Sequence, residues 1–572
     1  MVSPFPGAVF GILSVAIGLH YSGYWTLPTD LRGLIAKDET ENFNCRPFLP
    51  NIFTGNPPSD GHFSIAGASQ QLGDFLSNRF SVGDIDSLSV AVVSADGMLF
   101  EGNYGVMRGN ESQTSPPTTS DSMYRVASVS KLFNVLEGHI LAEKGVLSWE
   151  DPVEKYIPGF THNSGSLTSP GELLSSKKDP ITLFQLATHM SGLGRDWPPG
   201  NVANWPRDLQ GAGPPPTNGL PFPENAALFR SITENPLISP PFTWPIYSNA
   251  GTGLLGLALL EADRAARNAT ESMSYADLVK RDIFDPLGMN GSHFLTSEVN
   301  KHLVVVPSLA PEVADQDFLD AMNPAGGQFS SLRDSVTVVQ NLLNPEHPKS
   351  LISKAAMDKW LRPIHSFEED DWTEAGFIWE IVKAPDSNKR LRRIYWKLGA
   401  MAGYHAALAI HPGTSYGVVV LLGGHFPDAA ALAYHVFEIF QPAIDQALAD
   451  ASVARYAGEW FSQDRNSSAS IAVARGTLYI DRLIADNVDI LANFNPSSRV
   501  ALRWMHEHEE FRLDIGLPYY NGKKHMGCYS YWAGMDVWGM RNGAALNAIF
   551  FSGNELDRRL HVPAVGIEMV RA

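Results

Sequence analysis

The sequence predicts an α+β fold in which an antiparallel sheet is flanked by helices, followed by a C-terminal all-β, barrel-like domain. Strand-like segments begin and end the region 61–448, and the chain between them reads as mostly helical. After residue 449, short apolar runs alternate with Gly and Asn, a pattern typical of strands and tight turns. We therefore expect a signal peptide or anchor at 1–24, an extended arm at 25–60, a large α+β domain at 61–448 and a β domain at 449–572.

The individual strands are predicted from apolar runs and turn residues. Residues 88–94 and 98–102 flank Asp96-Gly97 and predict a β-hairpin, and 406–410 and 417–422 predict two further strands that share its sheet. In the β domain, the runs 470–474, 477–480 and 548–551 predict strands of a barrel or a sandwich.

One segment of the large domain reads as irregular. Residues 197–245 are rich in proline and contain Trp197, Trp205 and Trp244. Long irregular insertions in compact domains often have a function, so we expect a wall or roof of a pocket here. The alternative is a surface elaboration without a role.

Composition and charge exclude several classes of protein. The 572 residues are 44% hydrophobic and 18% charged, which is typical of a globular protein. The 43 basic residues are outnumbered by 61 acidic ones, so the net charge is −18. Nucleic acid is therefore not expected as a partner, because nothing would attract a phosphate backbone.

The N-terminus predicts a secreted protein or one of the secretory pathway. Residues 8–19 form an apolar run that has the length of a signal-peptide core and is too short to span a bilayer. No Lys or Arg precedes the run, so an uncleaved anchor is the alternative. No other membrane association is expected. N-glycosylation sequons fit the same compartment and are found at Asn110, Asn268, Asn290 and Asn466.

The two cysteines, Cys45 and Cys528, allow one disulfide at most and no zinc knuckle. A bridge between them would tie the arm to the C-terminal region. Two free buried thiols are the alternative. The stretch 44–60 around Cys45 is rich in Pro and Asn and predicts an extended segment.

The residues that could carry chemistry lie in three short motifs. Ser128 and Lys131 are three residues apart at the expected start of a helix, so the amine can reach the hydroxyl. A serine needs such a base to become a nucleophile, and the helix N-terminus can stabilise an oxyanion. Tyr247 and Asn249 precede a helix of small residues, and the third motif, 397–399, lies at a strand.

These motifs, Ser128-Val129-Ser130-Lys131, Tyr247-Ser248-Asn249 and Lys397-Leu398-Gly399, resemble the S-x-x-K, Y-x-N and K-T-G motifs of the serine β-lactamase and penicillin-binding-protein superfamily, in its class C branch. The resemblance covers roughly 60–447 and includes the stretches 181–193, 285–289 and 325–331. It implies that 61–448 is a catalytic domain with the β-lactamase/transpeptidase-like fold.

The resemblance also implies a covalent acyl-enzyme mechanism without a cofactor or a metal. Ser128 would attack a carbonyl, and Lys131 and Tyr247 would transfer protons. Asn249 would orient Lys131 and a substrate amide. Lys397 would attract developing negative charge, and Gly399 would belong to the same substrate-binding strand. The backbone N–H groups of Ser128 and Ala400 would form the oxyanion hole.

The third motif departs from the family pattern. Leu398 stands where a hydroxyl is usual, and Ala400-Met401-Ala402 is apolar, which argues against binding the carboxylate of a β-lactam. We therefore expect a small-molecule ester, amide or acyl substrate. Two alternatives stay open: an acyltransferase of secondary metabolism that uses the same three residues, and a non-catalytic binding or sensor protein. The oligomeric state is left open.

Three other patterns predict structure only. Gly413-Thr414-Ser415-Tyr416-Gly417 matches a nucleophile-elbow pattern, but a strand follows it, so we expect a hairpin turn. The segments 506–510 and 368–371 are rich in His and acidic residues, and we expect a solvated strand face and a solvated loop.

Overall fold

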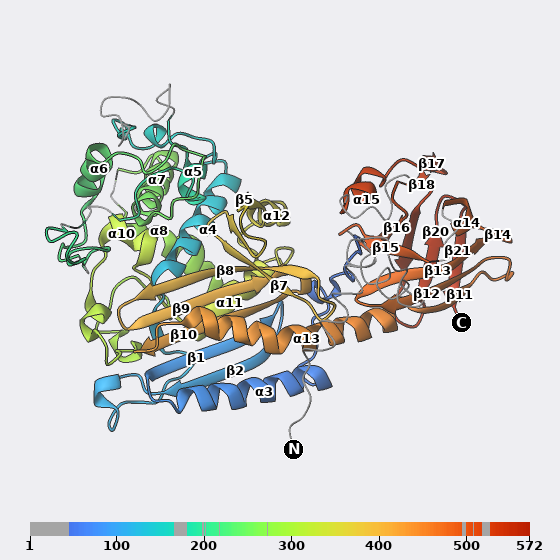
Figure 1. The fold of residues 1–572 in the computed structure, drawn as a ribbon, viewed down its shortest axis with the longest axis horizontal. Coiled ribbons are helices and arrows are strands. Elements are labelled where there is room, and N and C mark those ends of the chain that lie inside the picture. The colour runs from blue at the N-terminus through green and yellow to red at the C-terminus, as the bar shows by residue number, and fades with distance from the viewer. Residues whose placement is uncertain are drawn as a thin grey trace, which may run out of the picture. The chain divides into compact units, whose positions relative to one another are not determined.

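The computed structural model describes residues 45–164, 180–196, 200, 202–216, 218–270, 273–494, 499–506, 508–517 and 527–572. They form two compact units (Figure 1): residues 51–448, and a second unit in which 45–50 join 449–572. The signal peptide or anchor predicted at 1–24 and the first part of the predicted arm lie outside the described residues. In the described part of the chain, no helix is long and apolar enough to cross a membrane.

The first unit is built on an eight-stranded antiparallel sheet. Its order is β2-β1-β10-β9-β8-β7-β6-β5, with the bounds β1 (Ile85–Ser94), β2 (Met98–Gly105), β5 (Pro363–Ser366), β6 (Thr373–Gly376), β7 (Glu380–Pro385), β8 (Leu391–Met401), β9 (Tyr404–His411) and β10 (Tyr416–Gly424). Strands from both ends of the unit share the sheet, as predicted, and Val90 lies opposite Val420. The predicted hairpin is confirmed, since the N–H of Ser94 donates to the carbonyl of Gly97 across its turn.

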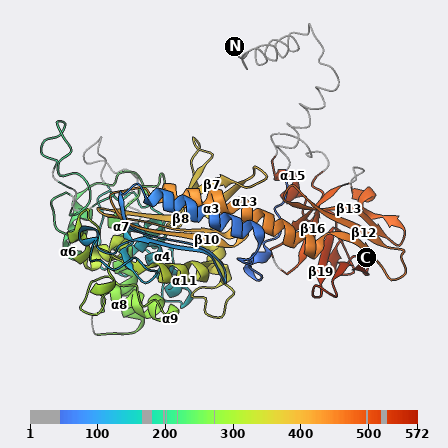
Figure 2. The ribbon, with the colours of Figure 1, turned by 90° about the horizontal axis from the view of Figure 1, so that it is seen from below.

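Helices cover both faces of this sheet (Figures 1 and 2). Figure 2 shows α3 and α13 on one face and α4 and α11 on the other. The α-helices of this unit are α3 (Phe63–Phe80), α4 (Ser130–Glu143), α5 (Leu183–Ala187), α6 (Asn225–Glu234), α7 (Asn249–Ala266), α8 (Tyr275–Val279), α9 (Asp285–Leu287), α10 (Leu319–Gly326), α11 (Leu332–Leu343), α12 (Lys354–Trp360) and α13 (Ala429–Tyr456), whose last turns belong to the second unit. The predicted α+β architecture is therefore confirmed.

Two details differ from the sequence-based expectation. The stretch 363–401 adds four strands, β5 to β8, whereas only the neighbourhood of Lys397 was expected to be a strand. The outer strands β5 and β6 have four residues each, too short for a clear alternating pattern. Within 197–245, residues 225–234 form the helix α6, which buries Leu228 and Ile232. This helix fits because prolines flank it and none lies inside it.

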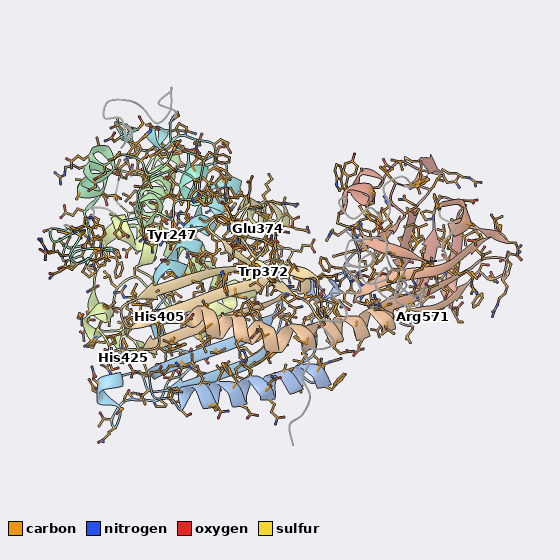
Figure 3. All side chains as sticks on the ribbon, in the orientation of Figure 1. Tyr247, Trp372, Glu374, His405, His425 and Arg571 are labelled. Carbon is orange, nitrogen blue, oxygen red and sulfur yellow. A yellow bond between two sulfur atoms is a disulfide. The ribbon has the colours of Figure 1, made fainter. Side chains whose placement is uncertain are left out.

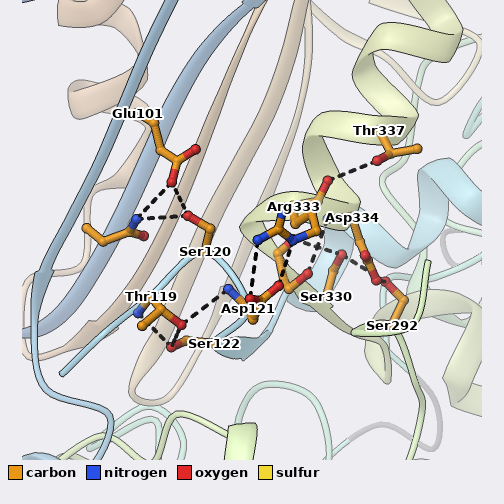
Figure 4. A network of polar contacts seen from close by, with 12 residues as sticks. Glu101, Thr119, Ser120, Asp121, Ser122, Ser292, Ser330, Arg333, Asp334 and Thr337 are labelled. Carbon is orange, nitrogen blue, oxygen red and sulfur yellow. Dashed lines mark hydrogen bonds and ion pairs between the residues drawn. The ribbon is translucent and has the colours of Figure 1, made fainter. Parts of the chain in front are cut away.

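A two-stranded sheet leads the chain to the predicted nucleophile. Its strands, β3 (Met123–Arg125) and β4 (Phe329–Ser331), pair antiparallel with Arg125 opposite Phe329. A polar network around the start of α11 ties this sheet to its surroundings (Figure 4). In it, Arg333 pairs with Asp121 at 2.7 Å, and Ser292 donates to the buried carboxylate of Asp334 at 2.8 Å. The segment just before Ser128 is thus held by pairing and by ion pairs.

The second unit is a closed β-barrel. Eight strands form a ring, which closes because β12 pairs with both β11 and β13. A ninth strand, β14, pairs with β13 outside the ring. The nine strands are β11 (Gly458–Phe461), β12 (Ser468–Ala474), β13 (Thr477–Ala485), β14 (Val488–Asp489), β15 (Val500–Trp504), β16 (Glu510–Asp514), β19 (Ala548–Ser552), β20 (Arg559–Val562) and β21 (Ile567–Arg571). Large side chains such as Trp460 and Phe511 are fully buried. The smaller elements are α14 (Ile490–Phe494), α15 (Tyr529–Ala533) and the pair β17 (Met540–Arg541) and β18 (Ala544–Ala545).

A disulfide joins Cys45 to Cys528 within the second unit, with their Cα atoms 4.8 Å apart. Of the two alternatives for these cysteines, the bridge is the one that the structure contains. It ties residues 45–50, which have no helix or strand, to the barrel.

Candidate active site

Ser128 lies on a strained turn at the start of α4. It belongs to a 3-10 turn, η3 (Ala127–Val129), so the α-helix begins at Ser130, later than the sequence predicted. Ala127 has φ 47°, a left-handed conformation that non-glycine residues rarely adopt. The hydroxyl of Ser130 holds this turn by donating to the carbonyl of Ala127 and accepting from the N–H of Gln328. Backbone strain of this kind is typical of functional sites.

Lys131 is a buried amine in contact with the Ser128 hydroxyl. Its Nζ lies 2.9 Å from Oγ of Ser128 and donates to the carbonyl of Ala325 at 2.6 Å. The side chain is fully buried. Burial disfavours the charged form and lowers the pKa of Lys131 to about 8. A minor but significant fraction of the amine is therefore neutral near physiological pH and can accept a proton.

Tyr247, whose place in the first unit is labelled in Figure 3, completes this group. Its ring lies 5.1 Å from each Nζ of Lys131 and Lys397, and the nearby Ser128 hydroxyl also favours its phenolate form. Burial alone would raise the pKa of Tyr247, but the two ammonium groups outweigh it and lower the pKa to about 8. The next residue, Ser248, caps α7 by accepting from the N–H of Gly251, which fixes the approach of the loop. The structure thus brings Ser128, Lys131 and Tyr247 together.

Lys397 has a partner that the sequence analysis missed. Its Nζ donates to the carboxylate of Glu380 at 2.6 Å, and the same carboxylate accepts the N–H of Leu398. Burial would lower the pKa of Lys397, but the negative charge of Glu380 outweighs it and raises the pKa. Lys397 therefore stays charged beside Tyr247. Only the register of β7 and β8, which places Glu380 opposite Trp396, could have identified this partner.

Gly399 allows β8 to approach the nucleophile turn. A Cβ on Gly399 would lie 2.1 Å from the carbonyl oxygen of Val126 and 3.2 Å from Cβ of Ala127. The strand and the turn are therefore in backbone contact here, and only glycine fits. Ala400, the next residue along β8, is exposed.

Asn249 differs from its expected arrangement. Its Nδ2 donates to the carboxylate of Asp196, and in the described part of the chain it makes no hydrogen bond to Lys131. The carbonyl of Ala325 holds the lysine in its place. Asp196 also lies 3.5 Å from Nε of Arg195, whose guanidinium lies over the Tyr247 ring at 4.6 Å. The sequence analysis named neither residue.

Arg125 is a second residue that the sequence analysis missed. It is fully buried three residues before Ser128, and it donates to four backbone carbonyls, those of Phe294, Ala314, Gln316 and Gly327. Its guanidinium also stacks on Phe329 at 3.9 Å. The four bonds from its two Nη groups offset much of the cost of burying the guanidinium, although its Nε has no partner among the described residues. Arg125 thus holds these loops around the site.

The segment 413–417, which matches the nucleophile-elbow pattern, is a turn between two strands, as expected. Ser415 is 2% exposed, and its Oγ contacts Asn51 and Thr54 at 2.7 and 2.6 Å. Its hydroxyl is thus occupied within the turn between β9 and β10. The sequon asparagines lie on the surface, and all four are exposed: Asn110, Asn268, Asn290 and Asn466.

Comparison with known proteins agrees with this geometry. A family model described as beta-lactamase matches residues 75–440. Beta-lactamase-like protein str6 of Strobilurus tenacellus is 35% identical over 311 residues, 52% of this chain and 98% of that protein. The related str5 is 39% identical over 229 residues, 39% of this chain and 81% of that protein.

Solved structures share the fold at low sequence identity. An octameric penicillin-binding protein homologue from Pyrococcus abyssi has a TM-score of 0.51 at 18% identity and covers 88% of this chain and 99% of its own. A β-lactamase/D-alanine carboxypeptidase from Yersinia pestis has a TM-score of 0.51 at 20% identity, over 66% of this chain and 98% of its own.

Proposed function

Because the chain belongs to the β-lactamase family of serine hydrolases, we propose that it cleaves a small-molecule ester or amide through a covalent acyl-enzyme on Ser128. The observation that carries this proposal is the contact of the Ser128 hydroxyl with the buried amine of Lys131, which lies next to the Tyr247 ring. The pKa values of Lys131 and Tyr247 are both lowered to about 8, and Ser128 is accessible while its neighbours in the turn are buried.

The reaction follows from these contacts. Oγ of Ser128 attacks the substrate carbonyl, and the neutral amine of Lys131 or the Tyr247 phenolate takes the hydroxyl proton. The proton then passes to the leaving alcohol or amine as the carbonyl–heteroatom bond breaks, which leaves an ester on Ser128. Water attacks that ester and regenerates the serine. Backbone N–H groups of Ser128 and Ala400 are the proposed donors to the oxyanion.

Lys397 contributes charge in this mechanism. Its ammonium is held by Glu380 and lies beside the Tyr247 ring, so it favours the phenolate form. The same residues would serve an acyltransferase, in which an alcohol or an amine replaces water in the second step. Product analysis with and without added nucleophiles separates these two reactions.

The first experiment is intact-mass spectrometry of the protein after treatment with a fluorophosphonate. We expect one adduct on the peptide that carries Ser128 and none in Ser128→Ala. Ser415→Ala is the matched control, because Ser415 is a buried serine of the same unit whose hydroxyl is occupied. A wild-type protein that is folded and takes no label, or a label that persists in Ser128→Ala, would refute the proposal.

We also propose that the protein passes through the secretory pathway. The disulfide between Cys45 and Cys528 and the exposure of all four sequon asparagines support this proposal. The test is the mass of the protein purified from its natural source before and after enzymatic deglycosylation. An unchanged mass, together with free thiols in the untreated protein, would contradict it.

A further inference from the structure

Arg195 lies beside the reactive group without belonging to it. Its Cζ is 4.6 Å from the centroid of the Tyr247 ring, closer than either lysine Nζ. Its backbone is fixed, because the carbonyl of Arg195 accepts the N–H groups of Asn249 and Ala250 at the start of α7. The base of this side chain is therefore held in place next to the proposed proton-transfer residue.

The three cations around Tyr247 differ in what they can offer a substrate. Lys131 and Lys397 are buried, and each already donates to oxygen atoms of the protein. The side chain of Arg195 is 63% exposed, and among the described residues its ion pair is that of Nε with Asp196 at 3.5 Å. Its two Nη groups make no hydrogen bond to the described residues.

A guanidinium with both Nη groups free binds a carboxylate through two parallel hydrogen bonds. The chain as a whole repels anions, since its net charge is −18, so a preference for an anionic substrate would have to arise locally. Arg195 provides such a local charge at the Tyr247 ring, which lies next to Lys131, the partner of Ser128.

We infer that Arg195 selects substrates that carry a carboxylate near the scissile ester or amide. The inference rests on the proposed function and names the substrate class of the same site. Lys397 does not supply this contact, because its buried ammonium is already paired with Glu380 and donates to the carbonyl of Leu398. The carboxylate would accept from the Nη groups of Arg195 while the substrate carbonyl lies at Ser128.

The test compares esters that differ only in charge. One pair is 4-nitrophenyl hydrogen adipate and its neutral methyl ester, and the other is 4-(hexanoyloxy)benzoate and its methyl ester. The first pair places the carboxylate in the acyl group and the second places it in the leaving group. The ratio of kcat/KM for the charged and the neutral member of each pair is measured in wild type and variants.

We expect the wild type to favour the charged member of one pair, and Arg195→Gln to lower that ratio by about tenfold, the usual size of an exposed charge-assisted contact. Arg195→Lys should restore part of the ratio, and added salt should lower it in the wild type. Arg230→Gln is the control, because Arg230 is an exposed arginine on α6 of the same unit, and it should leave the ratio unchanged.

Two results would overturn the inference. Equal ratios in wild type and Arg195→Gln would show that Arg195 does not recognise charge. An equal loss for both members of a pair, with a shifted pH profile, would show that Arg195 acts on Tyr247 instead. Fluorophosphonate labelling of Ser128 keeps the proposals apart: labelled enzyme with unchanged ratios refutes this inference alone, and an unlabelled, inactive wild type refutes the proposed function as well.

Discussion

Replacing Gly399 by alanine tests whether the contact between β8 and the nucleophile turn is needed for reactivity. The added Cβ would lie 2.1 Å from the carbonyl oxygen of Val126, whereas real Cβ contacts essentially never fall under 3.0 Å. The strand and the turn must therefore separate by about 0.9 Å. Both contacts are backbone or Cβ atoms, so no side-chain rotation can relieve the clash.

The expected cost has two parts. Overpacking of this kind destabilises a protein by about 1–3 kcal/mol. The displacement also separates Ser128 from Ala400, whose N–H groups are the proposed oxyanion donors, and a misplacement of about 1 Å costs about 100-fold in rate. We expect Gly399→Ala to remain folded and to react with a fluorophosphonate about 100-fold more slowly than the wild type.

The assay is the second-order rate of labelling at Ser128, followed by intact mass, with a thermal melt to show that the variant is folded. Gly67→Ala is the matched control, because Gly67 lies in α3 and has no atom within 4 Å of the built Cβ. A folded Gly399→Ala that labels at the wild-type rate would refute the reasoning that this close approach positions the oxyanion donors.

Three further predictions concern the site and its support. The labelling rate of Ser128 should rise about tenfold per pH unit up to pH about 8, because the base, Lys131 or Tyr247, must first lose one proton; a flat rate between pH 6 and 8 would contradict the assigned base. Arg125→Met should destabilise the first unit by about 3 kcal/mol, because four buried carbonyls lose their donors, and an unchanged thermal melt would exclude this role. Glu137→Gln should raise the melting temperature at pH 8 and not at pH 4. Burial and the neighbouring Asp282 raise the pKa of Glu137, so the native state loses stability as the pH rises above the unfolded pKa of about 4.3. An equal effect of this substitution at both pH values would disprove the linkage.

The sequence by itself determined the elements that depend on short-range pattern. The hairpin of β1 and β2, the strands β9 and β10 and three strands of the β domain, β12, β13 and β19, follow from apolar runs and turn residues, which act over a few residues of chain. A spacing of three residues at a helix start brings Ser128 and Lys131 within reach of each other. Tyr247 was identified by the resemblance of the three motifs to the β-lactamase superfamily.

Only the tertiary structure decided which distant groups meet these residues. Glu380 reaches Lys397 through the register of two strands, and Gly399 meets Val126 because a strand passes a turn that is far away in the sequence. Barrel closure likewise depends on one pairing, that of β12 with β13 in a ring of strands. Such contacts are set by how a whole sheet twists and packs, and no local pattern of residues encodes the register or the partner. The sequence thus identified the reactive group, and packing determined its charge and the space around it.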